Sequence, residues 1–77
     1  MRQLRDLVQE LEGLRATFGR SAAARKLSLL KTLASTPIRS ADLLVRLHDS
    51  LLFLRAYPDS GVVLQAAEAG LRGFIRR

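Results

Sequence analysis

Histidine and carboxylate side chains are the groups in this sequence that could carry acid–base or metal chemistry. His48 is the only histidine, and in a helix Leu44 and Leu52 would be its neighbours four residues away. A general base needs a partner that orients its ring, and a metal site needs several ligands. No carboxylate stands four residues from His48, so we expect this side chain to lie at the edge of a core.

The other common routes to catalysis are also missing from the sequence. There is no cysteine, which excludes disulfides, thiolate catalysis and zinc-finger chemistry. Gly70 and Gly73 lie inside a predicted helix, so they do not form a phosphate-binding loop. We therefore expect a protein that is not an enzyme and has no cofactor and no metal. The missing disulfides favour a reducing compartment, so we expect a cytoplasmic location.

The basic residues suggest one kind of partner. The formal net charge is +6, from 13 basic and 7 acidic residues, and such a balance suits an anionic surface such as nucleic acid. The candidate phosphate contacts cluster around the second predicted helix and at the carboxyl end: Arg20, Arg25, Lys26, Lys31, Arg72, Arg76 and Arg77. No helix has an unbroken basic face, and no aromatic residue interleaves with the arginines to stack on bases. A small basic nucleic-acid-binding protein is therefore the alternative function.

Four segments carry apolar residues at steps of three and four, which is the spacing of one helical face. The predicted helices span about 2–18, 22–35, 38–57 and 60–76. The predicted stops are Gly19, Pro37 and Pro58. The predicted N-caps are Ser21 and Asp59, and the third helix is expected to begin at Thr36–Pro37 or at Ser40. No segment alternates apolar and polar residues as a half-buried strand does.

These elements predict an all-α fold in which residues 1–77 form a single helical domain. We expect a four-helix antiparallel bundle or two stacked helical hairpins, with the third helix central because it is apolar nearly all round. Short links should make sequential helices pack against each other. No stretch approaches 18 uncharged apolar residues, so we expect no membrane partner. The lack of a stop signal after Gly73 leaves open that this is the N-terminal domain of a longer chain.

The third and fourth helices have more apolar surface than a closed four-helix bundle would bury. The candidate interaction residues form two strips, which are Val45, Leu52 and Phe53 on the third helix, and Val62, Ala66 and Gly70 on the fourth. One interpretation is that all of this surface is internal core. The other is an exposed patch that binds a partner. We favour a protein–protein interaction or oligomerisation module, which binds itself as a homodimer or binds another helical protein.

Overall fold

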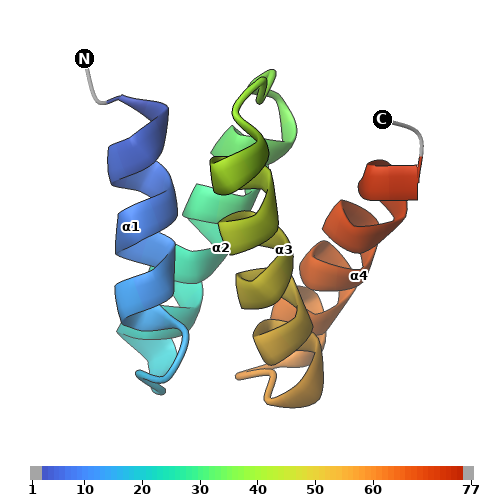
Figure 1. The fold of residues 1–77 in the computed structure, drawn as a ribbon. Helices are drawn as coiled ribbons and strands as arrows, with labels where there is room; N and C mark the ends of the chain where they lie inside the picture. The colour runs from blue at the N-terminus through green and yellow to red at the C-terminus, as the bar shows by residue number, and fades with distance from the viewer. Residues whose placement is uncertain (1–2, 76–77) are drawn as a thin grey trace.

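The computed structural model confirms the all-helical prediction and describes the backbone of residues 3–75 (Figure 1). The helices are α1 (Leu4–Leu14), α2 (Arg20–Ala34), α3 (Ala41–Ala56) and α4 (Gly61–Ile75). Within residues 3–75 there is no β-strand. None of the helices described is long and apolar enough to cross a membrane.

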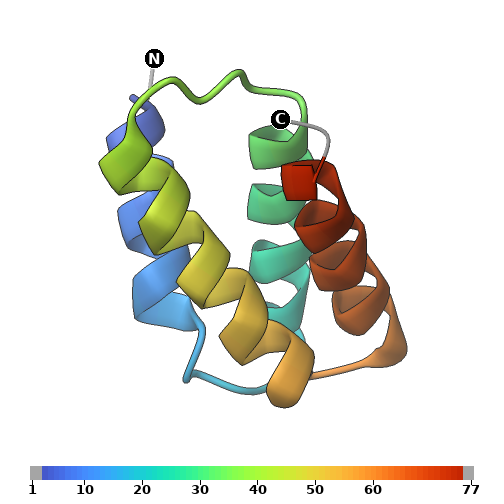
Figure 2. The ribbon, with the colours of Figure 1, turned by 45° about the vertical axis from the view of Figure 1, so that its right-hand side comes forward.

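The four helices form two antiparallel hairpins that stack side by side (Figures 1 and 2). Helix α1 packs against α2 and α3, whereas α4 packs against α3 and α2. Because each hairpin is antiparallel and the two hairpins are aligned, α1 and α3 run in the same direction, as do α2 and α4. The structure thus adopts the stacked-hairpin form of the predicted fold. Helix α3 is contacted on two sides, as expected, but so is each of the other three helices.

The expectation that all sequential helices would pack together is wrong for α2 and α3. These two helices lie on opposite sides of the core and are not packed as neighbours. The segment that joins them, residues 35–40, is the longest of the three links and crosses one end of the molecule (Figure 2). Its length lets α3 pass diagonally over to α1, so α2 is free to pack against α4.

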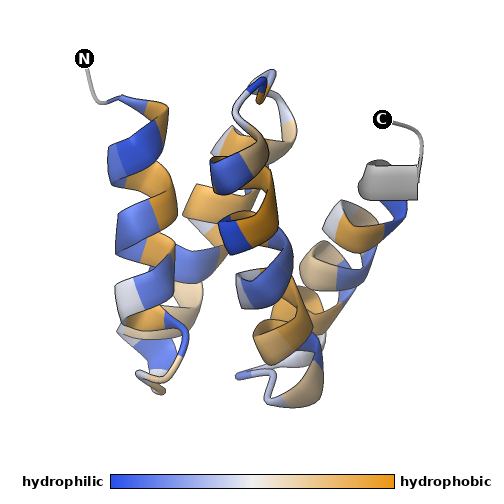
Figure 3. Ribbon diagram, in the orientation of Figure 1, coloured by the Kyte–Doolittle hydropathy of each residue, from blue (hydrophilic) through white to orange (hydrophobic). Residues whose placement is uncertain are grey.

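The core is aliphatic, as the composition predicts. Every helix and the 35–40 link contribute to it: Val8, Leu11, Leu29, Leu30, Leu33, Ile38, Leu47, Leu51, Leu54, Val63 and Ala67. Figure 3 shows this pattern most clearly on α1, which is apolar on the side toward α3 and polar on its outer side. Burial of these side chains is the main force that holds the hairpins together.

The first linker differs from the prediction at both of its ends. Helix α1 ends at Leu14 instead of residue 18, and a turn follows it in which the N–H of Thr17 donates to the carbonyl of Leu14 at 2.9 Å. Gly19 has a φ of 129°, which residues with a side chain rarely adopt, and it is the N-cap of α2. The predicted N-cap at Ser21 is therefore wrong, because this glycine turns the chain into α2 two residues earlier.

The starts of α3 and α4 show one prediction confirmed and one corrected. Ser40 caps α3, since its Oγ accepts a hydrogen bond from the Leu43 N–H at 3.3 Å. Asp59 does not cap α4. The Oγ of Ser60 accepts from the Val63 N–H at 3.4 Å in that role, while the Asp59 carboxylate turns into the protein interior.

Candidate functional site

A groove of about 230 Å³ opens between α2 and α4, with α3 beneath it. Its lining is aliphatic except for one lysine: Leu30, Lys31, Leu33, Ala34, Leu47, Leu51, Ala66, Ala69 and Gly70. Lys31, Ala34 and Ala69 are exposed and form the rim, whereas Leu47 and Leu51 are buried in the core. We call this feature the α2–α4 groove. It is an apolar hollow that solvent reaches.

The groove exists because one face of α4 carries small residues. Ala66, Ala69 and Gly70 are three or four residues apart or adjacent, so they share that face. A Cβ placed on Gly70 would lie 3.1 Å from Cδ1 of Leu51 and 3.3 Å from its Cδ2. Glycine at this position thus lets Leu51 pack directly against the α4 backbone, and the two alanines leave the space beside it unfilled.

Two of the three residues of the predicted α4 strip line the groove, whereas none of the predicted α3 strip does. Ala66 and Gly70 line the α2–α4 groove, and Val62 is 56% exposed one helical turn before Ala66. Val45 is 60% exposed, but Phe53 faces the first hairpin, where its ring lies 5.7 Å from the Arg15 guanidinium. Because single exposed apolar residues are common on monomers, Val45 by itself does not indicate an interface.

The remaining differences between the predicted residues and the lining of the groove concern Leu52 and the residues of α2. Leu52 is only partly buried on α3 and does not line the groove. Sequence reasoning did not name Leu30 and Ala34 on α2 or Ala69 on α4 as site residues, and it named Lys31 only as a phosphate contact. Ala69 could have been found, because it continues the row of small residues on α4. The α2 residues could not, since only the stacking of the hairpins brings α2 beside α4.

Lys26 is not on the surface, which corrects its assignment as a phosphate contact. Its side chain is fully buried, and its Nζ lies 2.6 Å from Oδ1 of Asp59, which is also buried. The ring centre of Phe18 is 4.7 Å from the same nitrogen, and the carbonyl oxygen of Arg15 is 3.5 Å away. The stacking of the hairpins places the α3–α4 turn over this lysine and excludes water from it.

The other candidate phosphate contacts differ in whether they have an ion-pair partner. Arg25 donates two hydrogen bonds to the Glu10 carboxylate of α1, and Arg72 lies 4.0 Å from Glu68 on its own helix. Arg20 and Lys31 are exposed and make no ion pair with any residue that the structure describes. The candidate contacts Arg76 and Arg77 lie outside the described residues.

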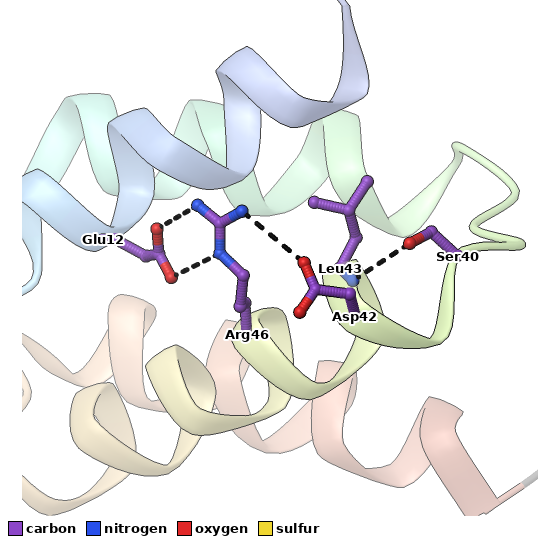
Figure 4. Close-up of polar contacts among 5 residues, drawn as sticks. All are labelled: Glu12, Ser40, Asp42, Leu43 and Arg46. Carbon is purple, nitrogen blue, oxygen red and sulfur yellow. Dashed lines mark hydrogen bonds and ion pairs between the residues drawn. The ribbon is translucent and has the colours of Figure 1, made fainter.

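A bidentate ion pair between Arg46 and Glu12 joins α1 to α3 (Figure 4). The Nη2 of Arg46 lies 2.6 Å from Oε1 of Glu12 and its Nε lies 3.0 Å from Oε2, a bidentate arrangement. The carboxylate of Asp42 is 4.0 Å from the same guanidinium. The hydrogen bonds from Arg46 lower the pKa of Glu12 below its ordinary value, against the opposing effect of burial, and the Arg46 and Arg15 charges lower it further.

This lowered pKa predicts a pH dependence. A carboxylate with a depressed folded-state pKa stabilises the fold above its unfolded pKa, and that stabilisation is lost as the pH falls through the folded value. Glu12→Gln should therefore lower stability at pH 7, and its difference from the wild type should shrink in acid. Urea titrations at pH 7 and pH 3 measure both values. Glu68→Gln is the control, and an equal pH dependence in both variants would contradict the prediction.

Among residues 3–73 no group of three or more histidine, aspartate or glutamate side chains could hold a metal ion. Searches for relatives found no matching family model, no matching curated protein and no matching solved structure. The function is therefore inferred from the geometry and charge of the site.

Proposed function

We propose that this chain is a non-enzymatic helical module that binds another protein chain in the α2–α4 groove. The observation that carries the proposal is an open hollow lined by leucine, alanine and glycine in so small a protein. Pockets for drug-sized ligands are about 300–1,000 Å³. A groove of about 230 Å³ is better suited to one large apolar side chain from a partner, which is how protein interfaces seat their anchor residues.

The shape of the groove also supports a helical partner. Two roughly parallel helices, α2 and α4, form its walls, and an amphipathic helix commonly lays its apolar face into a channel of this kind. The lining has no pair of acid and base side chains, so it supports binding rather than catalysis. The candidate partners are a second copy of this chain and a different helical protein.

Filling the groove should abolish binding without unfolding the protein. Ala69 is exposed at the rim, so the ring of Ala69→Phe can occupy the hollow while the buried side chains stay in place. A photoreactive amino acid at Ala34, on the opposite rim, should crosslink to one defined partner in the cells that make the protein. That adduct should disappear when Ala69→Phe is added.

Ala56 supplies the matched control, because it is exposed on α3 and does not line the groove. A photoreactive residue at Ala56 should not give the adduct, and Ala56→Phe should not remove the one formed from Ala34. Sedimentation of the wild type shows whether the partner is a second copy. The proposal is wrong if Ala34 gives no adduct beyond those from Ala56 and the protein sediments as a monomer at high micromolar concentration.

A further inference from the structure

We infer that the occupant of the α2–α4 groove is an acidic amphipathic helix of a different protein. Its apolar side chain enters the hollow, and one of its carboxylates pairs with Lys31 at the rim. This inference rests on the proposed function and names the partner that the groove selects.

The charge of α2 is the first observation that supports an acidic partner. The helix carries four basic residues, which are Arg20, Arg25, Lys26 and Lys31, and no acidic residue. The two in the middle are neutralised within the protein, by Glu10 and by Asp59.

Lys31 is left without such a partner at the rim of the groove. It is exposed, it lines the hollow, and it forms no ion pair with any residue in the described part of the chain. An apolar pocket with an uncompensated cation at its edge is complementary to an apolar side chain followed by a carboxylate.

The same charges disfavour a second copy in the groove. A two-fold interface uses the same surface on both copies, so α2 would lie in it twice and would bring no acidic residue from either copy. Each copy also has a formal net charge of +6. Like charges brought together across an interface cost affinity, whereas an acidic partner is attracted at long range as well as in contact.

The partner helix has a simple chemical description. Its apolar residues recur at three- and four-residue steps so that one row faces the groove. One turn of helix rises about 5.4 Å, so a glutamate one turn from the anchor residue lies on the same side as the anchor and can reach the rim. The remaining positions are polar or acidic.

Fluorescence anisotropy with synthetic helical peptides of about 18 residues tests this description. The acidic peptide has leucines at three- and four-residue steps and glutamates between them. Its twin has lysine in place of glutamate, and a third peptide is the acidic sequence scrambled. We expect the wild-type protein to bind the acidic peptide and neither of the others, and Ala69→Phe to abolish this binding.

Two charge reversals on α2 test whether the acidic peptide pairs with Lys31 itself or is attracted only by the net positive charge of the protein. Lys31→Glu should weaken binding of the acidic peptide about tenfold, because it removes the pairing cation and puts a like charge at the rim. Arg20→Glu makes the same change in net charge near the other end of α2 and should change affinity by less than about twofold. Circular dichroism melts of both variants check that each is folded.

Two other outcomes would overturn the inference and would show what the groove binds instead. If the lysine or scrambled peptide binds as well and Ala69→Phe abolishes that binding, the groove binds proteins without preference for acid. A dimer of the wild type that Ala69→Phe dissociates makes the second copy the occupant. In both cases the proposed function stands.

Three further results would also overturn it. Equal weakening by Lys31→Glu and Arg20→Glu would mean that the attraction is diffuse. Binding of a short RNA that competes with the peptide and is unaffected by Ala69→Phe would assign the basic surface to nucleic acid. If no peptide binds and Ala34 gives no crosslink, the proposed function fails together with the inference.

Discussion

Asp59→Ala should destabilise the protein by about 3–5 kcal/mol, because it leaves Lys26 as a buried cation without a carboxylate to neutralise it. The Lys26 side chain has no exposed surface, and its only carboxylate contact within the described residues is Asp59. The two residues are 33 positions apart and join α2 to the turn between α3 and α4. A loss of this size is comparable to the whole stability of a small domain, so the variant is expected to be largely unfolded.

The double variant Lys26→Met/Asp59→Leu tests whether the instability of Asp59→Ala comes from the unpaired Lys26 charge or from any substitution at this position. Removing both charges and keeping the volume should restore most of the stability, since a buried pair contributes little net free energy relative to apolar side chains of similar size. The pair is also incompletely satisfied, because Oδ2 of Asp59 is buried and accepts no hydrogen bond from any residue that the structure describes.

Urea unfolding followed by circular dichroism measures the three proteins. Glu68→Ala is the control, since it removes a carboxylate that is 44% exposed from a surface pair and should change stability little. A double variant as unstable as Asp59→Ala would show that the ion pair stabilises the fold by more than the burial of apolar side chains would.

Leu51→Ala should destabilise the protein by about 2–5 kcal/mol, because it removes a side chain that is 2% exposed at the contact of α3 with α4. Leu47→Ala, at a site 4% exposed on the same helix, should have an effect in the same range. Val45→Ala is the matched control on α3, because Val45 is 60% exposed and surface changes usually stay within about 0.5 kcal/mol. Thermal and urea melts that match the wild type for Leu51→Ala would contradict the structure of this contact.

Gly70→Ala tests the same contact from the side of α4. In the wild type its new Cβ meets the Leu51 methyl groups at 3.1 and 3.3 Å, which offsets the gain of about 1 kcal/mol in helix propensity. In the Leu51→Ala background that obstacle is gone, so the same substitution should be stabilising. Equal effects of Gly70→Ala in both backgrounds would mean that the two residues are not coupled.

Part of the candidate site was predicted from the sequence. Val62, Ala66 and Gly70 were predicted to form an interaction strip, and of these Ala66 and Gly70 line the α2–α4 groove. Lys26 shows what sequence reasoning could not find. Its position in α2 places it beside the apolar residues of that helix, but it does not indicate which carboxylate pairs with it in the interior. That carboxylate, on Asp59, had been predicted to cap α4. Ser60 is as good a capping residue, and only the packed structure decides which of the two turns inward.

The sequence by itself determined the number of helices, their approximate bounds and the aliphatic composition of the core. These properties depend on contacts between residues three or four apart, and on stops such as Pro37 and Pro58, which act over a single helical turn. Only the tertiary structure decided that α2 packs against α4 instead of α3, and therefore that Lys31 and Ala69 form opposite rims of one groove. Helix faces of similar hydrophobicity can pair in several ways. The choice among those pairings depends on side-chain volumes and on the reach of the 35–40 link, which periodicity along one helix does not report.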